Sequence, residues 1–257
     1  MRKLLFILFL NLIIQTGGVA QSAREISDKA TNMIEKNSME MTSVLKIMDD
    51  KGRERVRKMV ISTREFNGIT KTLVKFLEPA DIRGTSMLVY DYPDNPDDMW
   101  IYLPALRKVR RIVSDEKGNS FMGSEFSNAD LSVPEPENFE YKMVSVEMLD
   151  GSDCWKIEAS CKNGDISQEY GYVKRLMWID KNNFLTRKIE YYDLKGALHK
   201  VQRFSNYQKL PNGKYFAYSM EKENIQNGRK SIMAVEKFQD NSKLPENAFS
   251  SSMMAGL

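Results

Sequence analysis

Apolar and polar residues alternate with a period of two along most of the chain, in short runs separated by turn residues. In the first run, one face of an extended strand carries every second residue: Met39, Met41, Ser43, Leu45 and Ile47. Further on, Asn67-Gly68 joins two such runs, and both residues suit the positive φ angles of a type I′ hairpin turn. The pattern predicts roughly eleven to thirteen strands. Their ranges are 39–47, 53–66, 69–78, 85–92, 99–103, 107–113, 141–149, 154–161, 174–180, 184–193, 197–207, 214–223 and 229–238.

Before the first strand the period changes. Ile26, Ala30, Met33 and Ile34 recur at helical spacing, which predicts an amphipathic helix over residues 22–37. A short helical segment is also compatible with the region after Pro245. The turns between strands are short, which favours sequential antiparallel pairing. A single sheet of that width curls, because each strand adds right-handed twist. We therefore expect a mainly β (α+β) fold, in which a large curved antiparallel sheet forms an incomplete barrel and helices cover its concave face.

One stretch, Met99–Leu131, breaks the alternation of the sheet. It begins as an aromatic strand and continues through a basic run into a segment that contains glycine, serine and large apolar residues. Burying apolar surface is favourable by about 25 cal/mol per Å², so this segment should fold over the sheet as a lid. The candidate residues for the lining and the lid are Trp100, Tyr102, Leu103, Phe121, Met122 and Phe126. Plain core packing is the alternative role for them.

The first twenty residues have the pattern of a cleaved signal peptide. Arg2 and Lys3 precede an apolar run of about eleven residues, and Gly18-Val19-Ala20 provides a small-x-small cleavage site. The apolar run is too short to span a bilayer of roughly 30 Å, and no cysteine follows it. We therefore expect a signal peptide over residues 1–20, a single domain over residues 21–257, and export to the periplasm.

Charge and cysteine content narrow the function further. The full chain has 38 basic and 35 acidic residues, and the loss of Arg2 and Lys3 leaves the exported part nearly neutral. A nucleic-acid-binding protein would need a net basic field, so that class is disfavoured. Cys154 and Cys161 lie seven residues apart on one predicted strand, about 23 Å from each other if it is straight. A disulfide needs Cα atoms within about 7 Å, so two separate thiols are expected unless the strand is broken.

The sequence offers little for catalysis. His199 is the only histidine, and the chain has no Gly-x-Ser-x-Gly, phosphate-binding loop or dinucleotide-binding glycine motif. Glu135 and Glu137 flank Pro136 in a polar linker, where solvated loop residues are expected. We therefore expect that the protein is not an enzyme and that it uses neither a metal nor another cofactor.

Two side-chain populations remain informative. Sixteen methionines are many for a chain of 257 residues. Their flexible side chains suit either a surface that repacks around variable acyl chains or gap filling in an ordinary core. The second population is a basic cluster of Arg107, Lys108, Arg110 and Arg111. These side chains could bind an anionic head group or an acidic partner surface, or they could simply be solvated.

Three segments, in order, carry a family resemblance: FLEPADIRGT at 76–85, MWIYLPALRKVRRI at 99–112 and SFMGSEFSNADL at 120–131. The chain resembles the outer membrane lipoprotein-sorting protein family, which is related to the periplasmic carrier LolA. The resemblance implies a LolA-like incomplete barrel that carries lipid or acyl groups through the periplasm. It also implies a partner, an inner-membrane exporter of the resistance-nodulation-division type.

Three functional hypotheses follow. The first is a monomeric periplasmic carrier that holds lipoprotein acyl chains or other lipids in the hollow. The alternative is an envelope regulatory or sensor protein on the same fold, which binds a lipidated or exposed apolar partner. A structural envelope protein with a dry core is a third possibility. A roomy apolar cavity distinguishes the first two from the third.

Overall fold

The computed structural model describes residues 21–93 and 95–255. The signal peptide expected over residues 1–20 lies outside the described residues. Thirteen strands form one antiparallel sheet in that part of the chain. They are β1 Ser38–Met48, β2 Glu54–Phe66, β3 Ile69–Glu78, β4 Ser86–Asp91, β5 Asp98–Leu103, β6 Lys108–Ile112, β7 Phe139–Leu149, β8 Ser152–Cys161, β9 Lys174–Asp180, β10 Thr186–Tyr192, β11 Leu198–Lys209, β12 Tyr215–Asn224 and β13 Lys230–Asp240. The helices are α1 Ala23–Asn32, α2 Gly164–Tyr170 and α3 Ser251–Met254, and several short 3-10 turns join the strands.

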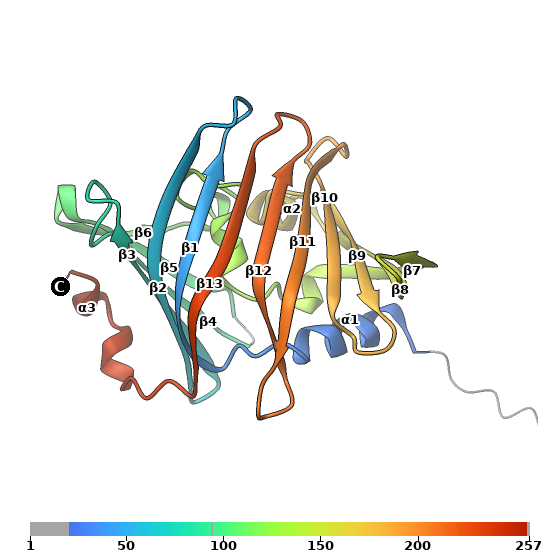
Figure 1. The fold of residues 1–257 in the computed structure, drawn as a ribbon, viewed down its shortest axis with the longest axis horizontal. Helices are drawn as coiled ribbons and strands as arrows, with labels where there is room; N and C mark the ends of the chain where they lie inside the picture. The colour runs from blue at the N-terminus through green and yellow to red at the C-terminus, as the bar shows by residue number, and fades with distance from the viewer. Residues whose placement is uncertain (1–20, 94, 256–257) are drawn as a thin grey trace, which may run out of the picture.

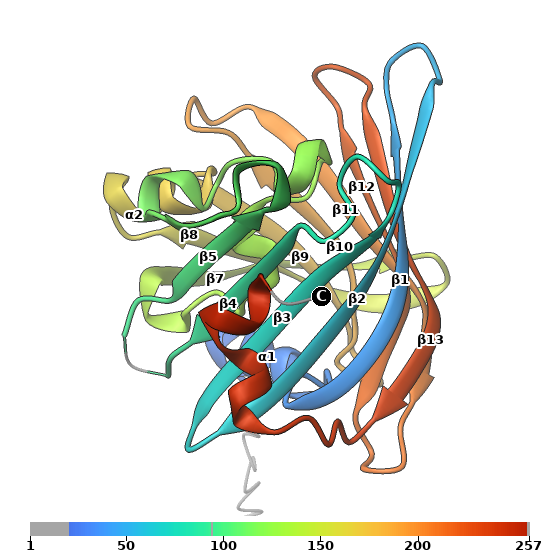
Figure 2. The ribbon, with the colours of Figure 1, turned by 90° about the vertical axis from the view of Figure 1, so that its left-hand side faces the viewer.

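The strand order of the sheet explains how the hollow is covered. The order is β6-β5-β4-β3-β2-β1-β13-β12-β11-β10-β9-β8-β7, so β1 pairs with β13 and the two edges are β6 and β7. These edge strands are consecutive in the sequence. The segment that joins them, residues 113–138, therefore has to cross from one edge of the open barrel to the other, and we call it the lid segment. It runs behind the strands in Figure 1 and beside α1 in Figure 2. Sequential antiparallel pairing and the open half-barrel are confirmed.

The alternation in β1 is confirmed residue by residue. The side chains predicted for one face, at positions 39, 41, 43, 45 and 47, are all buried, and their neighbours are less so. Asn67 and Gly68 have φ angles of 52° and 82°, as the hairpin turn requires. A period-two pattern is decisive here because a one-residue shift of register would turn every apolar side chain of β1 to the other face.

The N-terminal helix is shorter than predicted. A capping box between Ser22 and Glu25 starts α1, and the helix ends at Asn32 with Met33 as its C-cap. The expected continuation to residue 37 is wrong, because the chain there pairs with β12 instead. The Glu35 amide donates to the Tyr215 carbonyl (2.9 Å), and the Tyr215 amide donates to the Met33 carbonyl (2.8 Å).

Both faces of the sheet are covered, but by different parts of the chain. The lid segment and α1 lie on the concave face (Figures 1 and 2). The C-terminal segment, with the 3-10 turn Glu246–Phe249 and α3, packs on the outer face of β3–β5, where Phe249 and Met254 are buried. Cys154 and Cys161 are free thiols on β8. Within the described residues, every helix is too short or too polar to cross a membrane.

Candidate functional site: the hollow and its lid

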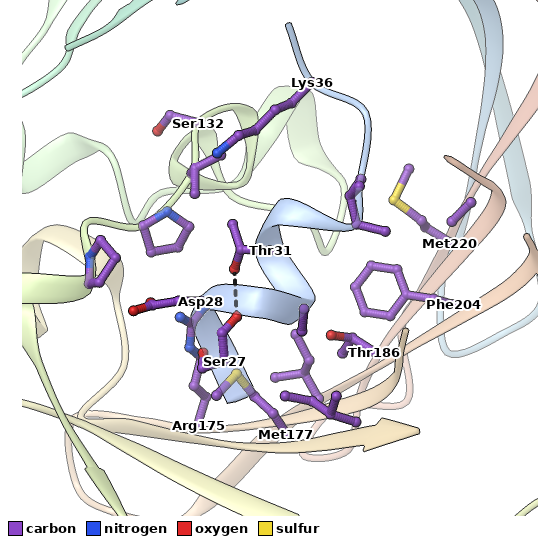
Figure 3. A pocket seen from close by; sticks show the side chains of 18 of the residues that line it. Ser27, Asp28, Thr31, Lys36, Ser132, Arg175, Met177, Thr186, Phe204 and Met220 are labelled. Carbon is purple, nitrogen blue, oxygen red and sulfur yellow. Dashed lines mark hydrogen bonds between the residues drawn. The ribbon is translucent and has the colours of Figure 1, made fainter. Parts of the chain in front are cut away.

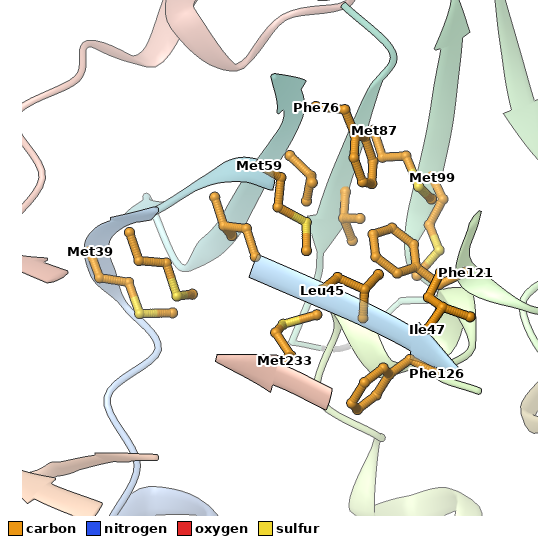
Figure 4. Close-up of a cluster of buried hydrophobic side chains, with 14 of the residues drawn as sticks. Met39, Leu45, Ile47, Met59, Phe76, Met87, Met99, Phe121, Phe126 and Met233 are labelled. Carbon is orange, nitrogen blue, oxygen red and sulfur yellow. The ribbon is translucent and has the colours of Figure 1, made fainter. Parts of the chain in front are cut away.

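The lid segment inserts two aromatic side chains into the hollow. Phe121 and Phe126 are 1% and 4% exposed and pack in one core cluster with residues of β1–β5 and β13. Figure 4 shows both rings directed toward the methionines and aliphatic side chains of the sheet. The Phe121 ring lies 5.8 Å from the Phe76 ring, centroid to centroid. The Phe121 amide donates to the Phe126 carbonyl (2.8 Å), which closes a tight loop and directs both rings inward.

Cations of the sheet hold the backbone of this loop. The Arg57 guanidinium donates to the Met122 carbonyl. The Arg229 guanidinium donates to the Gly123 carbonyl (2.9 Å), and the Lys200 ammonium donates to the Glu125 carbonyl (2.7 Å). Met122 itself has a φ angle of 51°, and its half-buried side chain packs against the same core cluster as Phe121 and Phe126.

Two carboxylates of the lid segment form ion pairs with the same sheet. Glu125 lies 3.3 Å from the Lys200 ammonium and 3.1 Å from the Arg229 guanidinium. Asp130 lies 2.7 Å from the buried ammonium of Lys222. Burial opposes ionisation of Asp130, but the attraction of Lys222 prevails and holds the pKa of Asp130 below its ordinary value. The side chains that hold the lid segment in this way are called the latch. They are Arg57, Glu125, Asp130, Lys200, Lys222 and Arg229.

Space remains under the cover. A cavity of about 290 Å³, the helix-side cavity, lies between α1, residues 132–136 and the strands β9–β12. Its walls are largely apolar, and Figure 3 shows the side chains that converge on it. They include Ala30, Ile34, Met177, Ile189, Phe204 and Met220.

A second cavity of about 250 Å³, the lid-side cavity, lies between the lid segment, β1–β4, β12 and β13. Phe121 and Phe126 line it together with Met39, Ile61, Leu131 and Met233. The two cavities are neighbours because the same side chains line both of them: Ile34, Lys36, Ser132, Val133, Phe216 and Met220. Ligand pockets in proteins usually measure roughly 300–1,000 Å³, and the two neighbouring spaces reach that size when they are taken together.

A titratable group, Asp91, lies where the lid segment passes the C-terminal end of β4. The Asp91 carboxylate accepts a hydrogen bond from the Val133 amide (3.3 Å), and it lines the lid-side cavity. Burial and, to a smaller extent, repulsion by Asp97 raise the pKa of Asp91 to about 6. Asp91, which holds the lid segment at this point, therefore changes its charge state at mildly acidic pH.

The structure separates the predicted lining residues into two groups. Phe121 and Phe126 line the lid-side cavity. Trp100 and Tyr102, by contrast, lie on the outer face of β5 under the C-terminal segment, and the Trp100 ring is 5.1 Å from that of Tyr90. Leu103 is half-buried at the end of β5, opposite Lys108. Trp100, Tyr102, Leu103 and Met122 line neither cavity.

The basic cluster lies on and beside the edge strand β6. Arg110 pairs with Glu116 (2.6 Å), and Arg111 pairs with Asp98. Arg107 and Lys108 are exposed, and neither forms an ion pair with another described residue. All four cations of the cluster are exposed, and nearby carboxylates neutralise two of them.

Most of the lining of the helix-side cavity was not singled out from the sequence. The missed side chains lie on β9–β12 and on the segments after α1 and before β7. Their signal was the period-two alternation of those strands, which shows two faces but not which face is concave. One missed residue, Arg175, is charged and lines the helix-side cavity next to Met177 and Ile179.

Comparisons with known proteins agree with this architecture. An outer membrane lipoprotein-sorting protein domain from Vibrio parahaemolyticus is 30% identical, and the match covers 91% of this chain and 98% of that one with a TM-score of 0.83. A DUF1329 family protein from Desulfovibrio piger is 27% identical, with 90% and 97% covered and a TM-score of 0.83. A LolA superfamily protein from Nitrosomonas europaea shares the fold at 19% identity, with 91% and 100% covered and a TM-score of 0.72. A family model described as an uncharacterized protein matches residues 68–255, and a search of curated proteins found no match.

Proposed function

Because this chain belongs to the outer membrane lipoprotein-sorting protein family and has the LolA-like half-barrel, we propose that it is a carrier for lipoprotein acyl chains or other lipids. The ligand occupies the hollow of the half-barrel, and the protein moves it between membranes through the periplasm. Residues 1–20 act as the signal peptide that delivers residues 21–257 there as a monomeric domain. The protein performs no catalysis in this role.

One observation carries the proposal: two adjoining apolar cavities lie between the concave face of the sheet and its cover. A core built only for stability is packed to near-crystalline density, with few voids larger than a water molecule. Methionines line both cavities, including Met220 between them, and their flexible side chains adapt to chains of different shape. An apolar ligand would occupy this space at a low cost in rearrangement.

The latch gives the carrier a way to admit and release its ligand. Phe121 and Phe126 exclude water from the lid-side cavity as long as the loop is docked. The loop is held by charged hydrogen bonds and ion pairs rather than by apolar contacts alone. Contact with a charged membrane partner would compete with these bonds and open the lid segment. An inner-membrane exporter of the resistance-nodulation-division type is the proposed partner, with Arg107 and Lys108 as contact residues.

Native mass spectrometry of the protein purified gently from the periplasm tests the carrier function, combined with extraction and identification of bound lipid. Ala217 is 7% exposed and lines the helix-side cavity, so Ala217→Phe fills part of the space that a ligand needs. Ala234 is on the neighbouring strand β13 and lines neither cavity, so Ala234→Phe is the matched control.

We expect the unmodified protein and Ala234→Phe to carry co-purified lipid, and Ala217→Phe to carry much less. The loss should appear without loss of folding, because cavity filling tends to preserve or raise stability. A protein that is empty and also fails to bind fluorescent acyl probes would refute the carrier and favour the regulatory alternative.

A further inference from the structure

Arg175 stands apart from the other cations of the interior. It is on β9, where it shares the concave face with Met177 and Ile179 and lines the helix-side cavity. Its Nε atom is inaccessible to water and has no hydrogen-bond partner. Among the described residues, no carboxylate lies within ion-pair distance of its guanidinium, and no side-chain hydrogen bond of Arg175 is formed.

The comparison with neighbouring cations makes this unusual. Lys117, Lys188 and Lys222 are all at most 15% exposed, and each lies within 2.7 Å of a carboxylate oxygen. Burying a charge is costly unless it is paired and hydrogen-bonded, and an uncompensated buried charge is strongly destabilising. The protein pairs these three lysines with its own carboxylates, whereas the half-buried Arg175, with its Nε atom enclosed, has no such partner.

Aromatic side chains surround Arg175 instead. Its guanidinium carbon lies 4.9 Å from the centroid of the Phe139 ring, which belongs to an aromatic cluster with Tyr170 and Tyr172. A cation–π contact orients the planar guanidinium, but it neither neutralises the charge nor uses its N–H donors. The Nη donors, which unlike Nε are not enclosed, therefore remain available to an oxyanion in the cavity.

Three other polar side chains of the cavity wall already have protein partners. Asp28 pairs with Arg24 (2.9 Å). The Tyr207 hydroxyl donates to the Thr186 carbonyl (2.6 Å), and the Thr31 hydroxyl donates to the Ser27 carbonyl (3.1 Å).

Lys36 is the other charged lining residue without an ion pair among the described residues. Figure 3 shows it near Ser132, on the far side of the cavity from Arg175 and Met177. The two charged side chains of the cavity wall that lack an ion pair are thus both positive, and they lie on opposite sides of the apolar space.

We propose that Arg175 binds the oxyanion head of a single-chain anionic amphiphile whose hydrocarbon chain occupies the helix-side cavity. This inference rests on the proposed lipid-binding function and specifies the ligand class. The guanidinium presents two parallel N–H donors, which match a carboxylate or a phosphate monoester bidentately. A cavity of about 290 Å³ is narrow, which favours one chain over the several chains of a mature lipoprotein anchor.

Displacement of the neutral dye phenylnaphthylamine by a matched set of ligands tests the inference on the purified protein. Dodecanoate, dodecyl phosphate and dodecanol share one chain and differ in the head, and inorganic phosphate supplies the anion without the chain. Arg175→Met removes the charge at similar length, and Arg175→Lys keeps the charge without the planar fork. Arg203→Met is the control, because Arg203 is exposed on β11 and lines neither cavity.

We expect at least one of the two anionic ligands to displace the dye at concentrations about tenfold lower than dodecanol does, which is the usual effect of a charged hydrogen bond. The preferred one identifies a fatty acid or a phosphate head as the source of the oxyanion. Arg175→Met should remove the preference, Arg175→Lys should retain part of it, and Arg203→Met should leave it intact.

Two results would overturn the inference. If all three dodecyl ligands displace the dye equally, in the unmodified protein and in Arg175→Met, the cavity binds apolar chains and Arg175 does not select the head; the proposed function then stands. If inorganic phosphate competes as well as dodecyl phosphate, the site is an anion site that makes no use of the cavity. A protein that binds neither the dye nor any ligand refutes the proposed function itself.

Discussion

The ammonium of Lys222 on β12 lies 2.7 Å from the Asp130 carboxylate of the lid segment, and the Lys222 side chain is only 3% exposed. The same ammonium is 4.1 Å from the centroid of the Tyr191 ring. This pair joins the lid segment to β12, which lies next to β13, the central strand of the sheet. The lid segment is thus fixed in the middle of its span as well as at its ends.

Breaking the Lys222–Asp130 pair should loosen the lid segment. Lys222→Met leaves Asp130 charged and without its partner. Loss of one member of a fully buried pair costs about 3–5 kcal/mol, and the cost here should be smaller because the Asp130 side chain is 25% exposed. We expect faster amide hydrogen exchange over residues 113–133 and a lower free energy of unfolding in urea. Adding Asp130→Asn to Lys222→Met should recover part of the loss, because the stranded charge is then gone. If the double variant is no more stable than Lys222→Met, the cost arises from lost packing of Lys222 instead.

The raised pKa of Asp91 makes stability depend on pH. Its folded-state pKa is about 6, above the value of 3.8 expected when the chain is unfolded. The folded state therefore binds the proton more tightly, and stability contributed by this group falls as pH rises from about 4 to 6 and stays lower above that range. Asp91→Asn should remove this dependence and raise the free energy of unfolding at neutral pH, by at most about 3 kcal/mol.

Urea unfolding at pH values on both sides of that window measures the effect. Asp50→Asn, at an exposed carboxylate in the turn after β1, serves as the control and should leave the pH dependence unchanged. An Asp91→Asn variant that follows the same pH curve as the unmodified protein would contradict the assignment.

Arg175 also predicts an effect on the ligand-free protein. Arg175→Met removes a half-buried charge that has no ion-pair partner among the described residues, so the lipid-extracted variant should melt at the same temperature or higher. Arg187→Met is the contrasting variant, because Arg187 pairs with the buried Asp180 carboxylate (2.8 Å) and its loss should cost about 3–5 kcal/mol. Equal destabilisation by both substitutions, in thermal melts of extracted protein, would mean that Arg175 has a structural role.

Some features could be predicted from the sequence because a local pattern determines them. The faces of β1 and the Asn67-Gly68 turn are of this kind. Phe121 and Phe126 were placed inside the protein because large rings in a loop have no other favourable location. Short turns determine most of the strand order in the same way, with two exceptions. The consecutive strands β6 and β7 do not pair with each other. The pairing of β1 with β13 joins residues about two hundred positions apart and leaves no local signal.

Other features depend on tertiary contacts that no local pattern reports. Both faces of β5 are apolar, because Met99 and Ile101 face the hollow and Trp100 and Tyr102 face the C-terminal segment. Alternation alone could not tell which pair lines the hollow. Arg175 was missed for a related reason, since a cation beside Leu176 and Met177 looks like the solvated end of a strand. Helix α2, which sequence reasoning also missed, did have local signals in its Asn163 N-cap and its Gly171 C-cap.

The division of β5 into two faces gives a final prediction, which separates ligand binding from stability. Trp100→Ala removes packing against Tyr90 on the outer face, whereas Phe121→Ala removes a ring that lines the lid-side cavity. Both substitutions should lower the free energy of unfolding, with up to about 3–5 kcal/mol for the fully buried Phe121. Only Phe121→Ala should change the affinity for a fluorescent acyl probe, because its ring lines one of the two adjoining cavities and the Trp100 ring lines neither. Titration of the probe under conditions where both variants are folded checks this expectation, and a comparable change in affinity for Trp100→Ala would assign the ligand to the other face of the sheet.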